Sequence, residues 1–157
     1  MMIMENPMLR VQHDAATGLL RVAWRAGQQV QGFRPALEWL MAFSRRKHVT
    51  NWLVDMLGVP PLGLPEQTWI AQEWFAAMAT TPVQHLALVL PTDMHNYLVA
   101  TAPVHEPALK PPFALHFFLD AESAFNWLLG EAPHRQQLWQ EWQQPPARFS
   151  ASVLRVP

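Results

Sequence analysis

Residues 50–66 read TNWLVDMLGVPPLGLPE, and this stretch decides the fold that the sequence predicts. It opens with an apolar segment, residues 51–56, that contains a single acid, Asp55, and it continues into a loop rich in glycine and proline. Short apolar runs bounded by turn residues are typical of buried strands. Because the ends of such strands form the edge where α/β proteins bind ligands, we expect a functional site to lie here.

The segments around this stretch alternate between strand and helix. Strands are predicted at residues 8–12, 19–24, 51–56, 83–90 and 113–119, and helices at residues 33–47, 66–80, 93–102 and 121–129. The order β-β-α-β-α-β-α-β-α predicts an α/β fold whose mixed sheet has right-handed crossovers.

The predicted domain covers residues 1–130, and residues 131–157 form a C-terminal extension that packs on the domain or on a partner. Within the extension, residues 133–143 are compatible with a helix. Two prolines then break the pattern, and residues 150–156 are compatible with an edge strand or with an arm onto a neighbouring molecule.

The composition favours a single globular domain. A length of 157 residues fits one domain, and half of the residues are hydrophobic whereas only 15% are charged. Since 11 Lys and Arg residues balance 12 Asp and Glu residues, a nucleic-acid partner or an anionic membrane partner is not expected. The absence of cysteine excludes disulfides, thiolate catalysis and Cys-ligated zinc.

The N-terminal sequence predicts a cytoplasmic protein. Glu5, Asn6 and Pro7 interrupt the first apolar residues before a signal-peptide core is formed. No other apolar run reaches the roughly 18 residues of a membrane helix, so we expect no membrane span.

The phrases NWLVDML, EQTWIAQEWF, LALVLP and FLDAESAFNWLL occur in an order that resembles the STAS-like (SpoIIAA-like) domains, most closely their bacterial (Bacteroidetes) members without an assigned function. The resemblance spans residues 8–130 and implies about five strands, about four helices and a non-enzymatic module that binds a protein partner or itself. In the anti-sigma antagonists of that superfamily, a serine or threonine near the start of the helix after the central strand is phosphorylated. Here Thr68 is the only hydroxyl residue of residues 55–68, and it lies inside the predicted helix rather than at its cap.

Three acids, Asp55, Asp93 and Asp120, follow the ends of the predicted parallel strands. Because those ends share one edge of the sheet, the carboxylates could converge on Mg²⁺. The simpler interpretation is that Asp93 and Asp120 cap helices, whereas Asp55 must reach the edge or a partner because burying it unpaired would be costly. His95 beside Asp55 could form a base and its orienting acid.

No recognisable motif supports that chemistry. The sequence contains no GxSxG, no HExxH and no glycine-rich phosphate loop. We therefore predict no catalytic residue, no metal and no cofactor, and an Mg-assisted or His-dependent enzyme is the weakest alternative.

Three of the eight tryptophans are displaced from the apolar faces of their predicted helices: Trp39, Trp69 and Trp127. At about 100° per residue, Trp69 falls almost opposite the face predicted to be buried. Either the C-terminal extension covers these indoles or they form an exposed aromatic patch, and the two explanations are compatible.

Two hypotheses of function follow from these patterns. The leading one is a module that binds a protein partner or itself as a homodimer, through the loop at residues 57–65 and the displaced tryptophans. The alternative is a carrier of a small apolar or lipid ligand, because the apolar loop at residues 57–62 could close over a pocket. The candidate binding residues are Asp55, Leu57, Gly58, Leu62, Trp69, Trp39 and Trp127.

Overall fold

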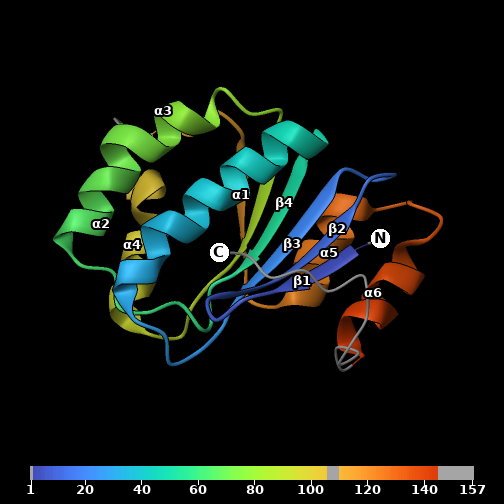
Figure 1. Cartoon of the computed structure of the whole chain (residues 1–157), viewed down its shortest axis with the longest axis horizontal. Coiled ribbons are helices and arrows are strands. Elements are labelled where there is room, and N and C mark those ends of the chain that lie inside the picture. Colours follow the sequence, from blue (N-terminus) through green and yellow to red (C-terminus); the bar gives the residue numbers. More distant parts are fainter. Residues whose placement is uncertain (1, 106–109, 145–157) are drawn as a thin grey trace.

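A computed structural model describes residues 2–105 and 110–144, which form a six-stranded mixed sheet with helices on both faces (Figure 1). The strands lie side by side in the order of the sequence: β1 (Met2–Glu5), β2 (Leu9–Asp14), β3 (Leu19–Trp24), β4 (Asn51–Asp55), β5 (His85–Val89) and β6 (Ala114–Phe118). The first three strands are antiparallel, and β3 to β6 are parallel.

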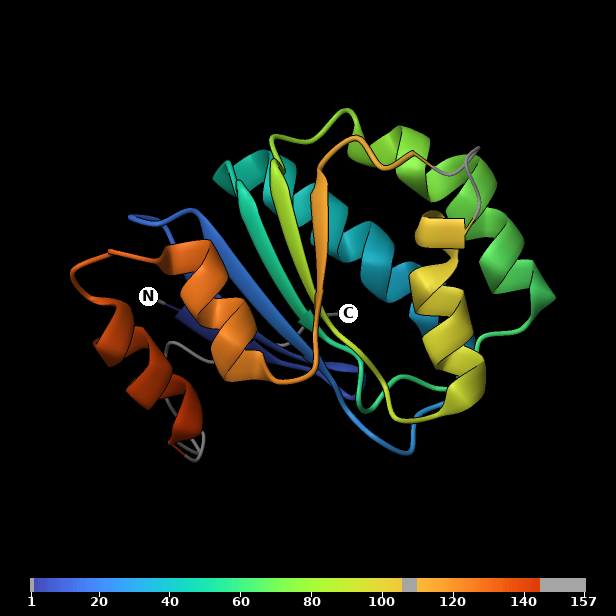
Figure 2. The same ribbon diagram turned by 180° about the vertical axis from the view of Figure 1, so that it is seen from behind.

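The helices divide between the two faces of the sheet (Figures 1 and 2). One face carries a short 3₁₀ turn, η1 (Val30–Gly32), followed by α1 (Phe33–Lys47). The same face carries a second, continuous helix that consists of α2 (Leu64–Trp69), the π-helical turn η2 (Ile70–Trp74) and α3 (Phe75–Met78). It also carries α4 (Met94–His105). The other face carries α5 (Ala121–Leu129) and α6 (Arg135–Gln143). None of the helices in the described ranges is both long enough and apolar enough to cross a membrane.

The predicted α/β class and mixed sheet are confirmed, and the predicted number of about five strands is one below the six strands described. β1 is an additional strand, and it pairs with β2 so that Met4 lies opposite Val11. A four-residue strand carries little pattern of its own, and its burial depends on a partner outside the segment. Residues 133–143 contain a helix, α6, whereas residues 150–156 lie outside the described part of the chain.

The opening stretch forms β4, which lies inside the sheet between β3 and β5. Because side chains alternate along a strand, Trp52 and Val54 face the α1 side of the sheet, whereas Leu53 and Asp55 face the α5 side. The same strand thus supplies both layers of the core, one of them around Trp52 and the other around Leu53.

Local capping defines α5 as the sequence predicts. Asp120 precedes the helix, and its Oδ1 accepts a hydrogen bond of 2.7 Å from the backbone N–H of Ser123. Gly130 follows the helix with a φ of +40°, a conformation that favours glycine. Both ends of the helix are therefore determined by residues that can be recognised without the structure.

Candidate functional site

A cavity of about 630 Å³ lies between the sheet and the helices on the α1 side. Its floor is apolar and consists of side chains from four neighbouring strands: Trp24, Trp52, Val54, Leu86, Leu88 and Leu115. Its walls come from three helical segments, with Phe33 and Leu37 from α1, Ile70, Ala71, Trp74 and Phe75 from η2 and α3, and Leu98, Val99 and Ala100 from α4.

The register of the parallel strands explains the apolar floor. Trp52 lies opposite Leu86, which lies opposite Leu115, and Val54 lies opposite Leu88. Residues paired in this way point to the same face of a sheet, so these rows form one continuous apolar surface. The period-two pattern of the sequence therefore determines which side chains form this surface. The size of the space above it depends on how the helices pack.

The π-helical turn η2 positions one wall of the cavity. A π turn inserts an extra residue into a helix, which changes the face that the following residues present. Trp69, just before the turn, and Trp74, at its end, are both buried in the core. The guanidinium of Arg34 also lies 5.1 Å from the centre of the Trp69 ring.

The prediction that Trp69 lies opposite the buried face is therefore wrong, because the calculation assumed a regular α-helix through residues 66–80. Trp39 and Trp127 do not form the exposed aromatic patch that was one of the two explanations for the displaced tryptophans. Trp39 is half-buried and stacks on Phe43 at 5.1 Å between ring centres, and Trp127 is half-buried with its ring centre 4.2 Å from that of His116.

The loop after β4 is held against the start of α4 by Asn96, which is 2% exposed. Its Oδ1 accepts a hydrogen bond from the backbone N–H of Leu62 at 3.0 Å, and its Nδ2 donates to the carbonyl of Pro60 at 3.1 Å. The ring N–H at Nε2 of His95 donates to the carbonyl of Leu62 at 2.6 Å. These bonds fix Leu62, which is buried, in the lining of the cavity.

Gly58 has a steric role in the same loop. A Cβ atom at this position would collide with the backbone carbonyl of Trp24, so only glycine allows the loop to approach β3 this closely. Trp24 itself lines the cavity. Gly58 is therefore explained by backbone packing beside the cavity.

Exposed apolar side chains occur on two segments that contribute to the cavity, and one of them, Leu98, lines it. We call five of them the apolar rim: Leu57 and Leu64 from the β4–α2 segment, and Met94, Tyr97 and Leu98 from α4. The bonds from Asn96 and His95 to the loop bring these two segments together. Sequence reasoning identified Leu57 but missed the rim residues of α4, because apolar residues on a helix are ordinarily assigned to the core.

The three acids singled out in the sequence each accept a hydrogen bond from a nearby backbone N–H. The partners are Leu57 for Asp55 at 3.0 Å, Asn96 for Asp93 at 2.8 Å and Ser123 for Asp120 at 2.7 Å. In the described ranges, no group of three or more His, Asp or Glu side chains could hold a metal ion. The geometry thus gives each acid a local structural role. Thr68 is exposed and lies in the cavity lining.

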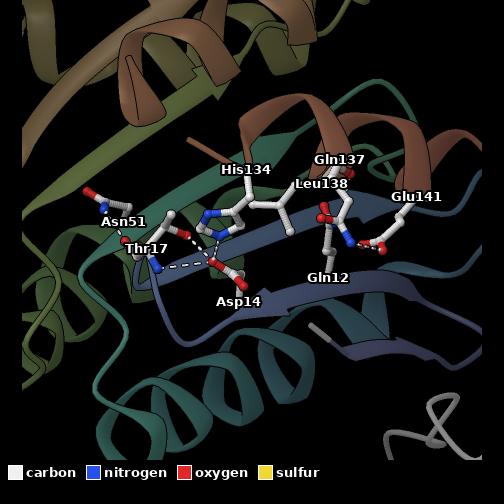
Figure 3. Close-up of polar contacts among 8 residues, drawn as sticks. All are labelled: Gln12, Asp14, Thr17, Asn51, His134, Gln137, Leu138 and Glu141. Atoms are coloured by element: carbon white, nitrogen blue, oxygen red, sulfur yellow. Dashed lines mark hydrogen bonds and ion pairs between the residues drawn. The ribbon is translucent and has the colours of Figure 1, made fainter. Parts of the chain in front are cut away.

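The opposite face of the sheet has a different character, because polar bonds attach α6 to β2 (Figure 3). Nε2 of Gln12 donates to the carbonyl of Leu138 at 2.9 Å, and Nε2 of His134 lies 2.9 Å from Oδ2 of Asp14. Burial opposes the charged form of Asp14, but hydrogen bonds from Thr17 and His134 outweigh it and lower the pKa of this carboxyl group.

Arg21 is buried beneath α6. Its guanidinium lies 4.4 Å from the Trp142 ring centre and 4.8 Å from that of Trp139. Burial lowers the pKa of Arg21 to about 10, while Asp55 acts in the opposite direction, so the side chain remains charged at neutral pH. This face is thus filled by aromatic and polar groups in mutual contact.

Comparisons with protein-family models, with curated proteins and with solved structures each found no significant match. The functional argument therefore depends on the geometry of the site.

Proposed function

We propose that this protein binds a small apolar molecule in the cavity between the sheet and α1 to α4. The observation that carries the proposal is the cavity itself, about 630 Å³ in volume and lined mainly by aliphatic and aromatic side chains. Ligand pockets commonly measure about 300–1,000 Å³ and have this kind of lining.

The cavity opens at the surface, where Thr68, Ala71, Gln72 and Leu98 of its lining are exposed. Water that fills it contacts a mainly apolar lining, and such contact is unfavourable. At about 30 Å³ per molecule, the cavity has room for about twenty waters, yet its inner surface offers few hydrogen-bond partners. An apolar ligand would bury this surface at a gain of about 25 cal/mol per Å².

Binding of Nile red, a neutral fluorescent dye, tests the proposal. Ala100 lines the cavity from α4, so Ala100→Phe should occupy part of the space and lower the affinity by about tenfold or more, which corresponds to roughly 1.4 kcal/mol. Ala76 is exposed and lies outside the lining, so Ala76→Phe is the matched control and should bind as the unmodified protein does. Equal affinity for both variants would contradict the proposal.

The second candidate function is binding to a protein partner or to a second copy of the chain. The apolar rim favours it, since Leu64, Met94 and Leu98 are 74%, 70% and 57% exposed. Contiguous exposed apolar side chains commonly mark interaction surfaces.

Light scattering distinguishes this second candidate. The double substitution Leu64→Ser with Met94→Ser should reduce self-association, because it removes apolar surface from the apolar rim. Leu119 is 85% exposed between β6 and α5, so Leu119→Ser is a control that removes an exposed apolar side chain outside the apolar rim. A monomer in all three proteins would exclude a homodimer formed through the rim.

The proposed role is that of a non-enzymatic STAS-like module in the cytoplasm, whose partner binding could respond to the ligand. The α/β order and the absence of a catalytic motif in the sequence support this interpretation. A phosphate on Thr68 would lie at the cavity lining, which makes ligand binding the property to measure if that residue is modified.

A further inference from the structure

The polar side chains in the cavity lining, apart from the indoles, come from two neighbouring places. Gln67, Thr68 and Gln72 belong to the helix α2–η2, and His95 belongs to the first turn of α4. Gln67 and His95 both bond to the carbonyl of Leu62, at 3.0 and 2.6 Å.

Thr68 and Gln72 are exposed, and their side chains make no hydrogen bond to another described residue. Both line the same cavity from one continuous helix, so their hydroxyl and amide groups are available to a polar group of the ligand. The cavity therefore has a polar side near the surface and an apolar interior.

The charges around the cavity disfavour an anionic ligand. Among the described residues that line it, none is Lys, Arg, Asp or Glu. The charged neighbours of its polar residues in sequence are acids, since Glu66 precedes Gln67 and Glu73 follows Gln72. Arg34, on α1, is already bonded to Glu38 at 3.1 Å and to Glu73 at 3.3 Å.

We propose that the ligand is an uncharged amphiphile, an apolar chain or ring system that ends in a hydroxyl, ester or amide group. This inference rests on the proposed function and adds the chemical class of the ligand. The apolar part lies over Trp52, Leu86 and Leu115, and the polar group is bound by Thr68 and Gln72. A carboxylate at the same place would find no Lys or Arg among the described residues of the lining, and Glu66 and Glu73 are close in sequence to Thr68 and Gln72.

Displacement of Nile red by three compounds with the same ten-carbon chain tests the inference. Decan-1-ol should displace the dye at a concentration about tenfold or more below that needed for decanoate at pH 8, because water holds the carboxylate more strongly than the hydroxyl group and the described lining offers no Lys or Arg. Decylamine, charged at that pH, should also be weaker than the alcohol. Decanoate or decylamine displacing the dye as readily as the alcohol would overturn the inference.

A charge introduced beside the polar group sharpens the test. Gln72→Lys places a cation at the cavity lining and should improve decanoate binding about tenfold relative to decan-1-ol. Ala76→Lys, outside the lining on the same continuous helix, should leave the ratio unchanged. If the preference for the alcohol survives in Gln72→Lys, the polar group does not bind at Gln72 and the inference fails.

Failure of this inference differs from failure of the proposed function. Displacement by decanoate with unchanged dye binding contradicts only the ligand class. If neither the dye nor any of the three compounds binds, the cavity does not take an apolar ligand, and both proposals are wrong.

Discussion

The two faces of the sheet are built from the same strands, yet one is hollow and the other is filled. On the α1 side, Trp52 and Val54 look into a cavity of about 630 Å³. On the α5 side, Leu53 lies in a compact cluster with Phe125 and Leu138, and α6 is bonded to β2 (Figures 1 and 3).

The difference between the two faces shows which side chains are packed tightly and which border open space in this fold. The filled face joins its layers by both apolar contact and polar bonds. The cavity found on it is smaller, about 330 Å³, and lies at the start of β4 and β5, where Asn51, His85 and Trp127 line it. On the hollow face, the loop–α4 contact is fixed by Asn96, but the centre between sheet and helices is open. We therefore expect substitutions in the buried cluster beneath α5 and α6 to change folding alone, whereas substitutions in the cavity lining should change binding.

The largest expected effect is the loss of a core side chain on the filled face. Leu138 is 1% exposed, and Leu138→Ala should lower the free energy of unfolding by about 2–5 kcal/mol, because it removes buried methyl groups and leaves a void. Chemical denaturation measures this change. Leu98→Ala, the same substitution on the hollow face, should stay within about 0.5 kcal/mol, because this side chain is mostly exposed. A similar loss of unfolding free energy in both variants would contradict the account that Leu138 is a core residue and Leu98 is not.

A smaller loss is expected when the contact between the loop and α4 is broken. Asn96→Ala leaves the buried N–H of Leu62 without its acceptor, which should cost about 1–3 kcal/mol. The same variant should bind Nile red more weakly, since Leu62 lines the cavity. Asn126 is exposed on α5, and Asn126→Ala is the control. Loss of stability with unchanged dye affinity would show that the loop does not shape the site.

The sequence predicts much of this fold because many of its signals are local. Asp120 and Gly130 delimit α5, and the apolar runs give β4, β5 and β6 at nearly the observed positions. β1 was missed because its pairing with β2 is tertiary, and the position of Trp69 was wrong because η2 changes the helical period.

The cavity is harder to predict from sequence. Period-two alternation identifies Trp52 and Leu86 as residues of one face, but it does not say whether side chains from α1 or α4 fill the space above them. Asn96 was missed for a related reason. A single asparagine in a helix carries no pattern, and its role depends on carbonyl groups more than thirty residues away in sequence.

Two neighbouring residues of β2, His13 and Asp14, lie on opposite faces of the sheet, and the pH dependence of stability should report on each of them. His13 is buried on the α1 side, where its ring packs edge-on against Phe43 at 5.2 Å. Burial lowers the pKa of His13, so the unfolded chain binds a proton more readily than the folded one. The stability that depends on neutral His13 is complete above the unfolded pKa of about 6.5 and is lost as the pH falls below it.

His13→Phe keeps an aromatic ring and removes that titration, so thermal unfolding should show a smaller fall in Tm between pH 7 and pH 5 than in the unmodified protein. Asp14, on the other face, has a lowered pKa and should cause a separate loss below about pH 4 in both proteins. An unchanged fall between pH 7 and pH 5 in His13→Phe would contradict the assignment to His13.

The smallest expected effect concerns the buried charge beneath α6. Arg21→Met keeps most of the side-chain volume and removes a buried cation, a change that is often neutral or stabilising, so the free energy of unfolding should change by less than about 1 kcal/mol. A loss above about 3 kcal/mol on chemical denaturation would show that the cation–aromatic contacts, rather than apolar packing, hold α6 in place.

The central claim is that the hollow face holds an apolar ligand, and native mass spectrometry of protein purified without detergent tests it most directly. We expect a mass above that of the chain alone, with the excess released on denaturation and reduced in Ala100→Phe. The bare mass of the chain in the unmodified protein, together with no rise in Tm when decan-1-ol is added, would contradict the claim.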